Sequence, residues 1–329
     1  MKTLSWISLV GGLAVVALLV AWQGFGTVAG ILGALGAGVV LLPLVWLPHV
    51  WLGAASWRLL FAAGRAPRLA SAVWALWLGH SLGTLVPMAT VGDEVVKARA
   101  LMLRGVRGVD ASASVVVDKT VQALSLLAWG LIGAVALVTL KAETVVVAAA
   151  LGGLALLAGG IAGFVAIQRI GAFGFVARAL ARLSRSGNVS GLVDGARDVD
   201  AAIRALYDRP GRIALACGVR LAARGLLTAE VLLAAYLMGQ PLGVVEALML
   251  RSLATALRGA AFVVPNGLGV QEGGFIVLGA LVGQPPEFML ALSLATRARE
   301  IIVAVPGLVA WQHAEGRALW DRLSSHPRR

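Results

Sequence analysis

The sequence predicts an all-α polytopic membrane protein. Of its 329 residues, 59% are hydrophobic and only 13% are charged, and the mean hydropathy is +0.89. This leaves too little polar surface for a water-soluble globular protein. Apolar runs recur at lengths that reach the roughly 20 residues needed to cross a bilayer. The 41 glycines against 8 phenylalanines indicate helices held together by close approach rather than by bulky side chains. These observations exclude a soluble enzyme.

Six apolar runs are predicted to be full crossings. They cover residues 4–22, 27–63, 112–140, 144–167, 213–238 and 288–311. The first run resembles a signal peptide in position, but no small-residue cleavage site follows it, so we interpret it as an anchor. The second is too long for a simple span, and Pro43 and Pro48 are expected to kink it.

Two further hydrophobic segments, residues 69–90 and 244–283, are interrupted by proline, glycine and carboxylates. We predict that both are re-entrant helical hairpins. The connections on one side of the six crossings then carry 19 basic residues, whereas those on the other side carry only Lys141. This asymmetry predicts that both termini are cytoplasmic. It also requires the first hairpin to open to the cytoplasm and the second to the outside, as in an inverted repeat.

The chain is predicted to form a single integral membrane domain. Its first half is residues 1–168, its second half 213–312, and its cytoplasmic tail 313–329. Between the halves, residues 169–212 form a connector with an apolar stripe at helical spacing, and we expect it to lie on the cytoplasmic membrane face. It either binds anionic head groups nonspecifically or offers a dedicated partner site. The net charge of +12 fits loops that face anionic lipid, so no nucleic acid partner is expected.

The two interrupted segments share a pattern. An apolar pair precedes Pro87 and another precedes Pro265, small and flexible residues follow, and Glu94 and Glu272 come seven positions after the prolines. Such backbone should unwind and expose groups that lipid cannot satisfy, which is tolerated only against protein or a polar cavity. Breaks at comparable places in two halves are typical of transporters with a central site. The alternative is two coincidental turns. The candidate site residues of the breaks are Pro87, Gly92, Asp93, Glu94, Pro265, Asn266, Gly267, Gly269 and Glu272.

Ionisable groups inside the membrane are costly unless they are paired or hydrated, so each is a functional candidate. The candidates outside the breaks are Asp118, Lys119, Arg258, Arg297, Arg299 and Glu300. Guanidinium groups suit a phosphate or pyrophosphate head group, and an excess of arginine over Glu272 and Glu300 is expected to attract an anion. The alternative is that these residues neutralise one another as structural contacts between helices. Arg220 and Arg224 are expected to lie near the cytoplasmic interface and extend toward it.

Signals for catalysis are weak. The four histidines are scattered, Cys217 is the single cysteine, and no nucleotide-binding or metalloprotease motif is present. No cofactor, metal or catalytic residue is therefore predicted. A membrane-embedded enzyme acting on lipid head groups would need an acid/base pair such as Glu94 with His80.

Four stretches carry a family resemblance: residues 82–104 (LGTLVPMATVGDEVVKARALMLR), 114–122 (SVVVDKTVQ), 262–274 (FVVPNGLGVQEGG) and 296–307 (TRAREIIVAVPG). They resemble successive motifs of the lysylphosphatidylglycerol synthase transmembrane-region family, a flippase-like membrane domain. Asp118-Lys119-Thr120 and residues 56–60 (SWRLL) look most like its hopanoid-biosynthesis-associated branch. Gly92-Asp93-Glu94 departs from the commoner family form, which often has a basic residue there.

The resemblance implies movement of lipids between leaflets. In the full synthases a soluble aminoacyltransferase domain follows, whereas this chain ends 18 residues after Trp311, so aminoacylation is not expected. The sequence therefore predicts a flippase-like lipid transporter, or a lipid-binding transport component, of the bacterial inner membrane, acting on a hopanoid or phospholipid. The alternative is a scaffold that holds lipid-biosynthetic enzymes without transport. An interior lined with Arg and Glu favours transport, whereas charges confined to the cytoplasmic face favour the scaffold.

Overall fold

The computed structural model describes residues 17–18, 21, 25–62, 64–85, 92–170, 190–261 and 264–324. Within these ranges the chain forms helices joined by short turns, and no β-strand occurs. The all-α prediction is therefore confirmed. The predicted first crossing, residues 4–22, lies outside the described residues except for 17, 18 and 21.

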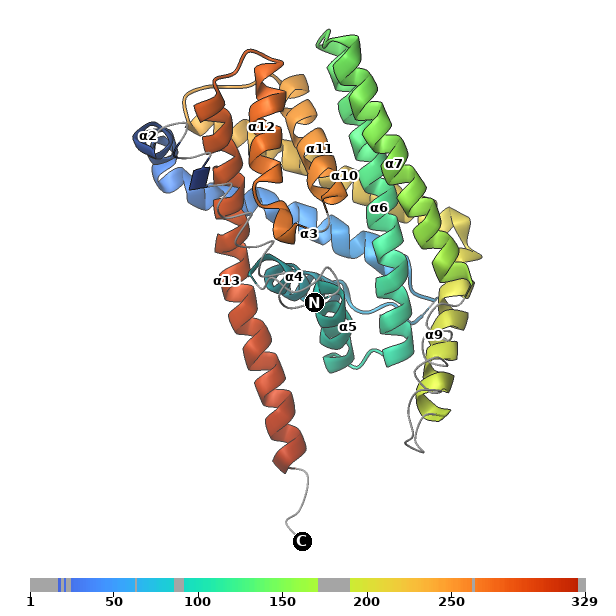
Figure 1. Cartoon of the computed structure of the whole chain (residues 1–329). Helices are drawn as coiled ribbons and strands as arrows, with labels where there is room; N and C mark the ends of the chain where they lie inside the picture. Colours follow the sequence, from blue (N-terminus) through green and yellow to red (C-terminus); the bar gives the residue numbers. More distant parts are fainter. Residues whose placement is uncertain are drawn as a thin grey trace.

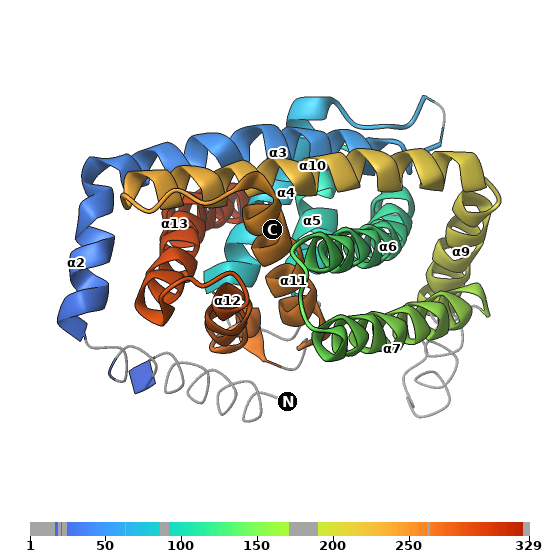
Figure 2. The same cartoon turned by 90° about the horizontal axis from the view of Figure 1, so that it is seen from above.

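The second apolar run forms three consecutive helical pieces, α2 (Phe25–Leu35), the 3-10 helix η1 (Gly36–Leu41) and α3 (Leu42–Arg58). Gly36 has a φ of +47°, a conformation that glycine adopts without the steric cost of a side chain. The chain changes direction between α2 and α3 at this point (Figure 2). The bend thus precedes Pro43, which lies in the first turn of α3, where a proline is tolerated.

The remaining helices follow in order along the chain. The first half continues with α4 (Leu69–Leu85), α5 (Gly92–Leu103), α6 (Gly108–Thr139) and α7 (Thr144–Arg169). The second half contains α9 (Ser190–Tyr207), α10 (Pro210–Leu237), α11 (Val244–Ala260), η2 (Pro265–Gly267), α12 (Val270–Ala280) and α13 (Pro286–Ser324). Helices α3 and α10 lie side by side (Figure 2), and in Figure 1 α3 runs across the direction of α6 and α7.

Three described segments are long and apolar enough to cross a membrane, namely 25–58, 108–139 and 144–169. Helix α4 is apolar but shorter. Helices α10 and α13, which were also predicted to cross, are not among the three, and both carry several charged residues within their length. The apolar helices place the protein in a membrane, while the count of six crossings stays a prediction.

The second predicted hairpin, residues 244–283, contains two helices, α11 and α12, whereas the described part of the first, residues 69–90, contains α4 alone, and α5 begins after it at Gly92. Helices α4 and α5 have 17 and 12 residues, and α11 and α12 have 17 and 11 residues. The two pairs also pack similarly, α4 on α5 and α11 on α12. In Figure 1 the α11/α12 pair lies above the α4/α5 pair. The matching lengths favour a repeat, whereas re-entry from opposite membrane sides stays a prediction.

The connector packs onto the membrane helices through α9. Ile203 of α9 is fully buried, and Tyr207 at its end contacts Thr120 of α6. Residues 171–189, with the predicted stripe positions Leu180 and Leu183, lie outside the described part of the chain.

Two apolar clusters with a charged layer between them organise the interior. On α13, residues 288–292 and Ala295 belong to one cluster and Val303 belongs to the other. Arg297, Arg299 and Glu300 come between them on the same helix. On helix α10, Ala216 and Leu227 belong to the second cluster and 231–235 contribute to the first, so Glu230 lies between the clusters while Arg220 and Arg224 lie within the stretch of the second. Arg297, Arg299, Glu300 and Glu230 therefore lie within the length of these helices, between apolar residues of the two clusters.

Candidate functional site: an interior layer of ion pairs

The break between α11 and α12 is an unwound segment held by one arginine. Asn266, Gly267 and Gly269 have φ values of +55°, +59° and +81°, which are favourable mainly for glycine and asparagine. The helical hydrogen bonds stop there and leave carbonyl groups free. Arg297 of α13 donates to the carbonyl oxygens of Gly267 at 3.1 Å and Asn266 at 3.3 Å. The break is thus satisfied by protein, as a nonaqueous interior requires.

Glu272 is the third residue of α12 and is fully buried. One carboxylate oxygen accepts the backbone N–H of Gly269 at 2.8 Å, which caps the helix. The carboxylate also pairs with the Arg297 guanidinium through both of its oxygens. The partner of this buried glutamate is therefore an arginine.

Arg258, near the end of α11, joins the same break to α13. It donates to Glu300 at 2.7 Å and to Gln271 at 3.0 Å, and it also bonds the side-chain oxygen of Asn266. The Arg258 side chain is 24% exposed, against 9% for Arg297. Arg258 is therefore the more accessible of the two arginines at the break.

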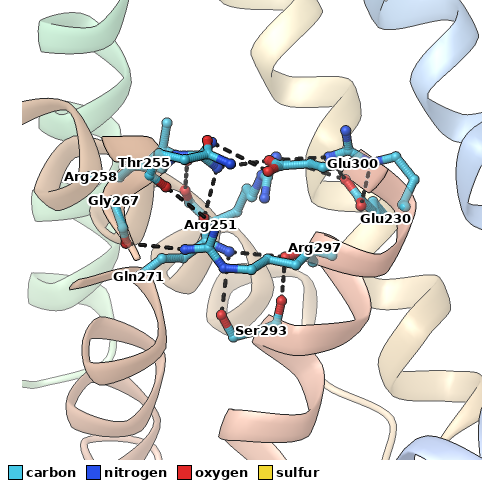
Figure 3. Close-up of polar contacts among 12 residues, drawn as sticks. Glu230, Arg251, Thr255, Arg258, Gly267, Gln271, Ser293, Arg297 and Glu300 are labelled. Carbon is cyan, nitrogen blue, oxygen red and sulfur yellow. Dashed lines mark hydrogen bonds and ion pairs between the residues drawn. The ribbon is translucent and has the colours of Figure 1, made fainter. Parts of the chain in front are cut away.

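Arg299 points to a different carboxylate, Glu230 of α10, with bonds of 2.9 and 3.0 Å. Arg251 of α11 lies 3.8 Å from the same carboxylate. Figure 3 shows Glu230 of α10, Arg251 and Arg258 of α11, Gln271 of α12, and Arg297 and Glu300 of α13 gathered in one polar layer. Glu230 was not among the predicted site residues, although a single carboxylate inside the apolar run 213–238 was a signal for it.

The first break has its own group of charges. Pro87 lies outside the described residues, as do 86–91. Gly92 begins α5, and Glu94, its third residue, pairs with Lys97 at 3.0 Å and Lys119 at 2.8 Å. Asp93 lies 3.8 Å from both lysines. At this break two lysines, rather than an arginine, pair with the glutamate, and a compact ammonium group can approach two adjacent carboxylates.

Glu94 and Glu272 occupy equivalent positions, each the third residue of the helix after a break. A carboxylate there is stabilised by the free N–H groups of the first turn. Their position in the first turn of a helix therefore accounts for part of the pattern seen in the sequence. Whether the two breaks form one shared site stays a prediction.

A third group joins α6 to α10. Asp118 is fully buried, pairs with Arg220 and accepts from Gln122 at 2.7 Å. Arg224 donates to the Ser125 hydroxyl at 3.2 Å and to the Gln122 carbonyl at 3.0 Å. The expectation that Arg220 and Arg224 extend to the membrane surface is wrong, because both turn toward α6, where polar partners satisfy them.

A model of one protein family matches most of the chain. The model described as the lysylphosphatidylglycerol synthase TM region matches residues 9–307. The chain belongs to this family. The match includes both breaks and all three groups of charges. Comparisons with curated proteins and with solved structures give no match.

In this family member the three groups of charges described above together hold more positive than negative side chains. The cations are Lys97, Lys119, Arg220, Arg224, Arg251, Arg258, Arg297 and Arg299, and the carboxylates are Asp93, Glu94, Asp118, Glu230, Glu272 and Glu300. The excess was expected at Arg258, Arg297 and Arg299, but each of these has a close carboxylate. Among the described residues the surplus lies instead at Arg224, which has no carboxylate partner, and at Arg251, which shares Glu230.

A largely apolar cavity of about 720 Å³ opens between α6, α7 and α10. Its walls include Leu124, Leu127, Ile161, Val165, Ile213 and Cys217. At one end the Tyr207 hydroxyl donates to Gln168 at 2.6 Å and contacts Thr120. Burial raises the pKa of Tyr207 above its usual value of 10, so the hydroxyl stays protonated. The cavity suits an apolar ligand with a polar end.

Glu94 and His80 are the acid/base pair that the enzyme alternative would need. His80 of α4 stacks on Trp46 with ring centroids 5.6 Å apart, and its Nε2 has no hydrogen-bond partner among the described residues. The hydrogen bonds that the Glu94 carboxylate accepts come from Lys97 and Lys119. No hydrogen bond joins Glu94 to His80 in the described structure, as the acid/base pair would need.

Proposed function

We propose that this protein moves a lipid with an anionic or polar head group between membrane leaflets, as a flippase-like transporter or as the lipid-binding component of one. Its location is the bacterial inner membrane, with both termini in the cytoplasm. The lipid is a hopanoid or a phospholipid. The proposal assigns no catalytic step to the protein.

The observation that carries this proposal is the charged layer between two apolar clusters. Charges in a membrane interior are expensive, and they persist where they pair with one another or serve a polar ligand. A scaffold that binds cytoplasmic enzymes needs charges on its cytoplasmic face but none midway along α10 and α13. A polar head group that crosses a bilayer needs polar partners at that depth.

Arg258 is the interior side chain best placed to bind a polar head group. Arg258 bonds both Glu300 and the Asn266 side chain of the break, and it is partly exposed. A lipid phosphate can replace the carboxylate on a guanidinium because both accept two parallel hydrogen bonds. By this exchange the head group leaves water in steps. At each step its phosphate keeps a guanidinium partner, so neither charge is left unpaired. The sequence contains no ATP-binding motif, so a gradient or downhill equilibration drives the movement.

The test is phospholipid exchange between leaflets in reconstituted vesicles that contain the purified protein. We expect the wild type to exchange a fluorescent phospholipid faster than protein-free vesicles do. Arg258→Gln should slow the exchange, because it keeps hydrogen-bonding capacity but removes the charge. Arg197→Gln, on the exposed surface of α9 with its side chain 58% exposed, is the matched control and should exchange at the wild-type rate.

Failure of the wild type to move any tested phospholipid or hopanoid would contradict the proposal and favour the scaffold. Chemical conversion of the lipid in the same vesicles would instead support the membrane-embedded enzyme. Equal rates of lipid exchange for the wild type and Arg258→Gln would show that the charge of Arg258 does not contribute to lipid movement.

A further inference from the structure

Among the described residues, His80 of α4 is the histidine with a buried ring nitrogen that has no hydrogen-bond partner. Its Nε2 is buried, although the residue as a whole is only partly buried. His49 of α3, by contrast, has its Nδ1 2.8 Å from the carbonyl oxygen of Ala223. Buried polar groups are normally satisfied, so the exception at His80 needs a physical reason.

Helix α4 places His80 next to the charged part of α13. Trp77, three residues earlier and on the same face of α4, donates to the carbonyl oxygen of Val303 at 2.9 Å. Val303 lies one turn beyond Glu300 on α13. From α3, the uncharged ring of Trp46 lies against the imidazole. The histidine ring is therefore held between an aromatic ring and the layer of ion pairs.

Charged side chains from three helices surround this ring. Those that act on it most strongly are Arg299 and Glu300 of α13, Arg258 of α11 and Lys97 of α5. Three of them are cations, and Glu300 is the one carboxylate in this set. In the described structure Glu300 accepts hydrogen bonds from Arg258. A positive charge on the imidazole is thus disfavoured while Arg258 holds Glu300.

This balance changes when an anionic head group takes the place of Glu300 on Arg258. Glu300 then keeps only Arg299, at 4.0 Å, and Arg299 is already bonded to Glu230. A carboxylate without a close partner is costly in a membrane interior. A proton on the neighbouring imidazole would compensate it, and histidine is the side chain that gains and loses a proton near neutral pH.

We propose that His80 binds a proton when an anionic head group occupies Arg258, so that lipid movement is coupled to a proton gradient. The proton comes from bulk water and forms an N–H bond on the ring, which then donates to Glu300. When the head group leaves, Arg258 bonds Glu300 again and the ring returns its proton to water. The inference rests on the proposed function and names the gradient that drives it.

Proton uptake on lipid binding tests the site in the purified full chain in an uncharged detergent. The probe is phosphatidylglycerol, and diacylglycerol with the same acyl chains is the uncharged control. A pH indicator in weak buffer near neutral pH should report up to about one proton taken up per phosphatidylglycerol and none with diacylglycerol. Proton and lipid must favour each other equally, so lowering the pH from about 8 to about 6 should strengthen phosphatidylglycerol binding at least about fivefold.

Three variants separate His80 from other groups that take up protons. His80→Gln should lose most of the uptake, and its lipid affinity should change less than about twofold between the two pH values. Glu300→Gln should also lose the uptake, because it removes the carboxylate with which the imidazolium pairs. His313→Gln carries the same chemical change at an exposed position of α13. It is the matched control and should take up protons as the wild type does.

A pH gradient across reconstituted vesicles tests the coupling itself, with the membrane potential held at zero. A difference of about one pH unit should concentrate fluorescent phosphatidylglycerol in the leaflet on the alkaline side, by up to about tenfold if one proton accompanies each lipid. In His80→Gln the distribution should stay as it is without a gradient.

Absence of proton uptake by the wild type would overturn the inference, and so would wild-type uptake by His80→Gln. Should His80→Gln not fold, Glu300→Gln decides, and unchanged uptake by it overturns the inference. Proton uptake on binding without leaflet exchange would keep the proton site and refute the transport function. Leaflet exchange by the wild type without proton uptake or a response to the pH gradient would refute the proton site and keep the function.

Discussion

Glu230 is the carboxylate on which the interior charge balance depends most. It is fully buried, bonds Arg299 through both oxygens, and lies 3.8 Å from Arg251. Breaking a buried pair from one side leaves the other charge uncompensated, which costs more than the pair itself contributes. Neutralising Glu230 would leave Arg251 without its ion-pair partner and Arg299 with only the more distant Glu300 carboxylate, at 4.0 Å.

We therefore expect Glu230→Gln to lower the free energy of unfolding by about 3 to 5 kcal/mol. Thermal unfolding of the purified protein in detergent measures this as a lower transition temperature. The control is Glu143→Gln, at an exposed position before α7, which should leave the transition unchanged. Equal transition temperatures for the two variants would show that solvent or another group neutralises Arg299 and Arg251.

At residue scale, sequence reasoning found the break between α11 and α12 but not the ion pairs. Proline, glycine and a glutamate seven positions later form a local signal, and the unwound residues 265–269 follow from it. The partners of Arg297 and Arg299 could not be predicted in the same way. These residues are two apart on α13, so they point in different directions, one to Glu272 and the other to Glu230. Only the packing of α10 and α12 decides which carboxylate each meets.

At the scale of helices, close approach depends on small residues at a few crossings. A Cβ atom added at Gly133 of α6 would overlap the Ser252 hydroxyl and lie 2.8 Å from Leu253 Cγ, both on α11. At Gly153 of α7 an added Cβ would meet nothing within 4 Å. The prediction from composition that helices pack closely is thus correct at particular glycines, but composition could not say which ones.

Gly133→Val should consequently separate α6 from α11 and destabilise the protein by about 1 to 3 kcal/mol or more, as overpacking does. Gly153→Val has the same chemical change and should have a much smaller effect. Thermal unfolding of both variants in detergent compares them. A larger loss for Gly153→Val than for Gly133→Val would contradict the α6/α11 contact.

At the scale of the whole molecule, the charge asymmetry predicts the orientation in the membrane. Arg104 should be cytoplasmic, while Lys141 and Gln284 should face outside, because only this arrangement collects the basic connections on one side. The structure supplies the helices and their packing but leaves this orientation as a prediction from the sequence. Equivalent lengths of the α4/α5 and α11/α12 pairs favour the repeat on which it depends.

Single cysteines at positions 104, 141 and 284, in a Cys217→Ser background, test the orientation with a membrane-impermeant thiol reagent. Reagent applied outside should label positions 141 and 284 but not 104. Protection of position 284 from outside, with labelling from the cytoplasm, would contradict both the topology and the inverted repeat.

The central claim is that the charged interior layer receives a lipid head group. Cryo-electron microscopy of the protein in nanodiscs that contain phosphatidylglycerol tests it most directly. The account predicts phosphate density inside the helix bundle, within about 4 Å of an interior guanidinium such as Arg224 or Arg258. Lipid density confined to the outer surface, with the interior arginines bonded only to protein, would contradict it.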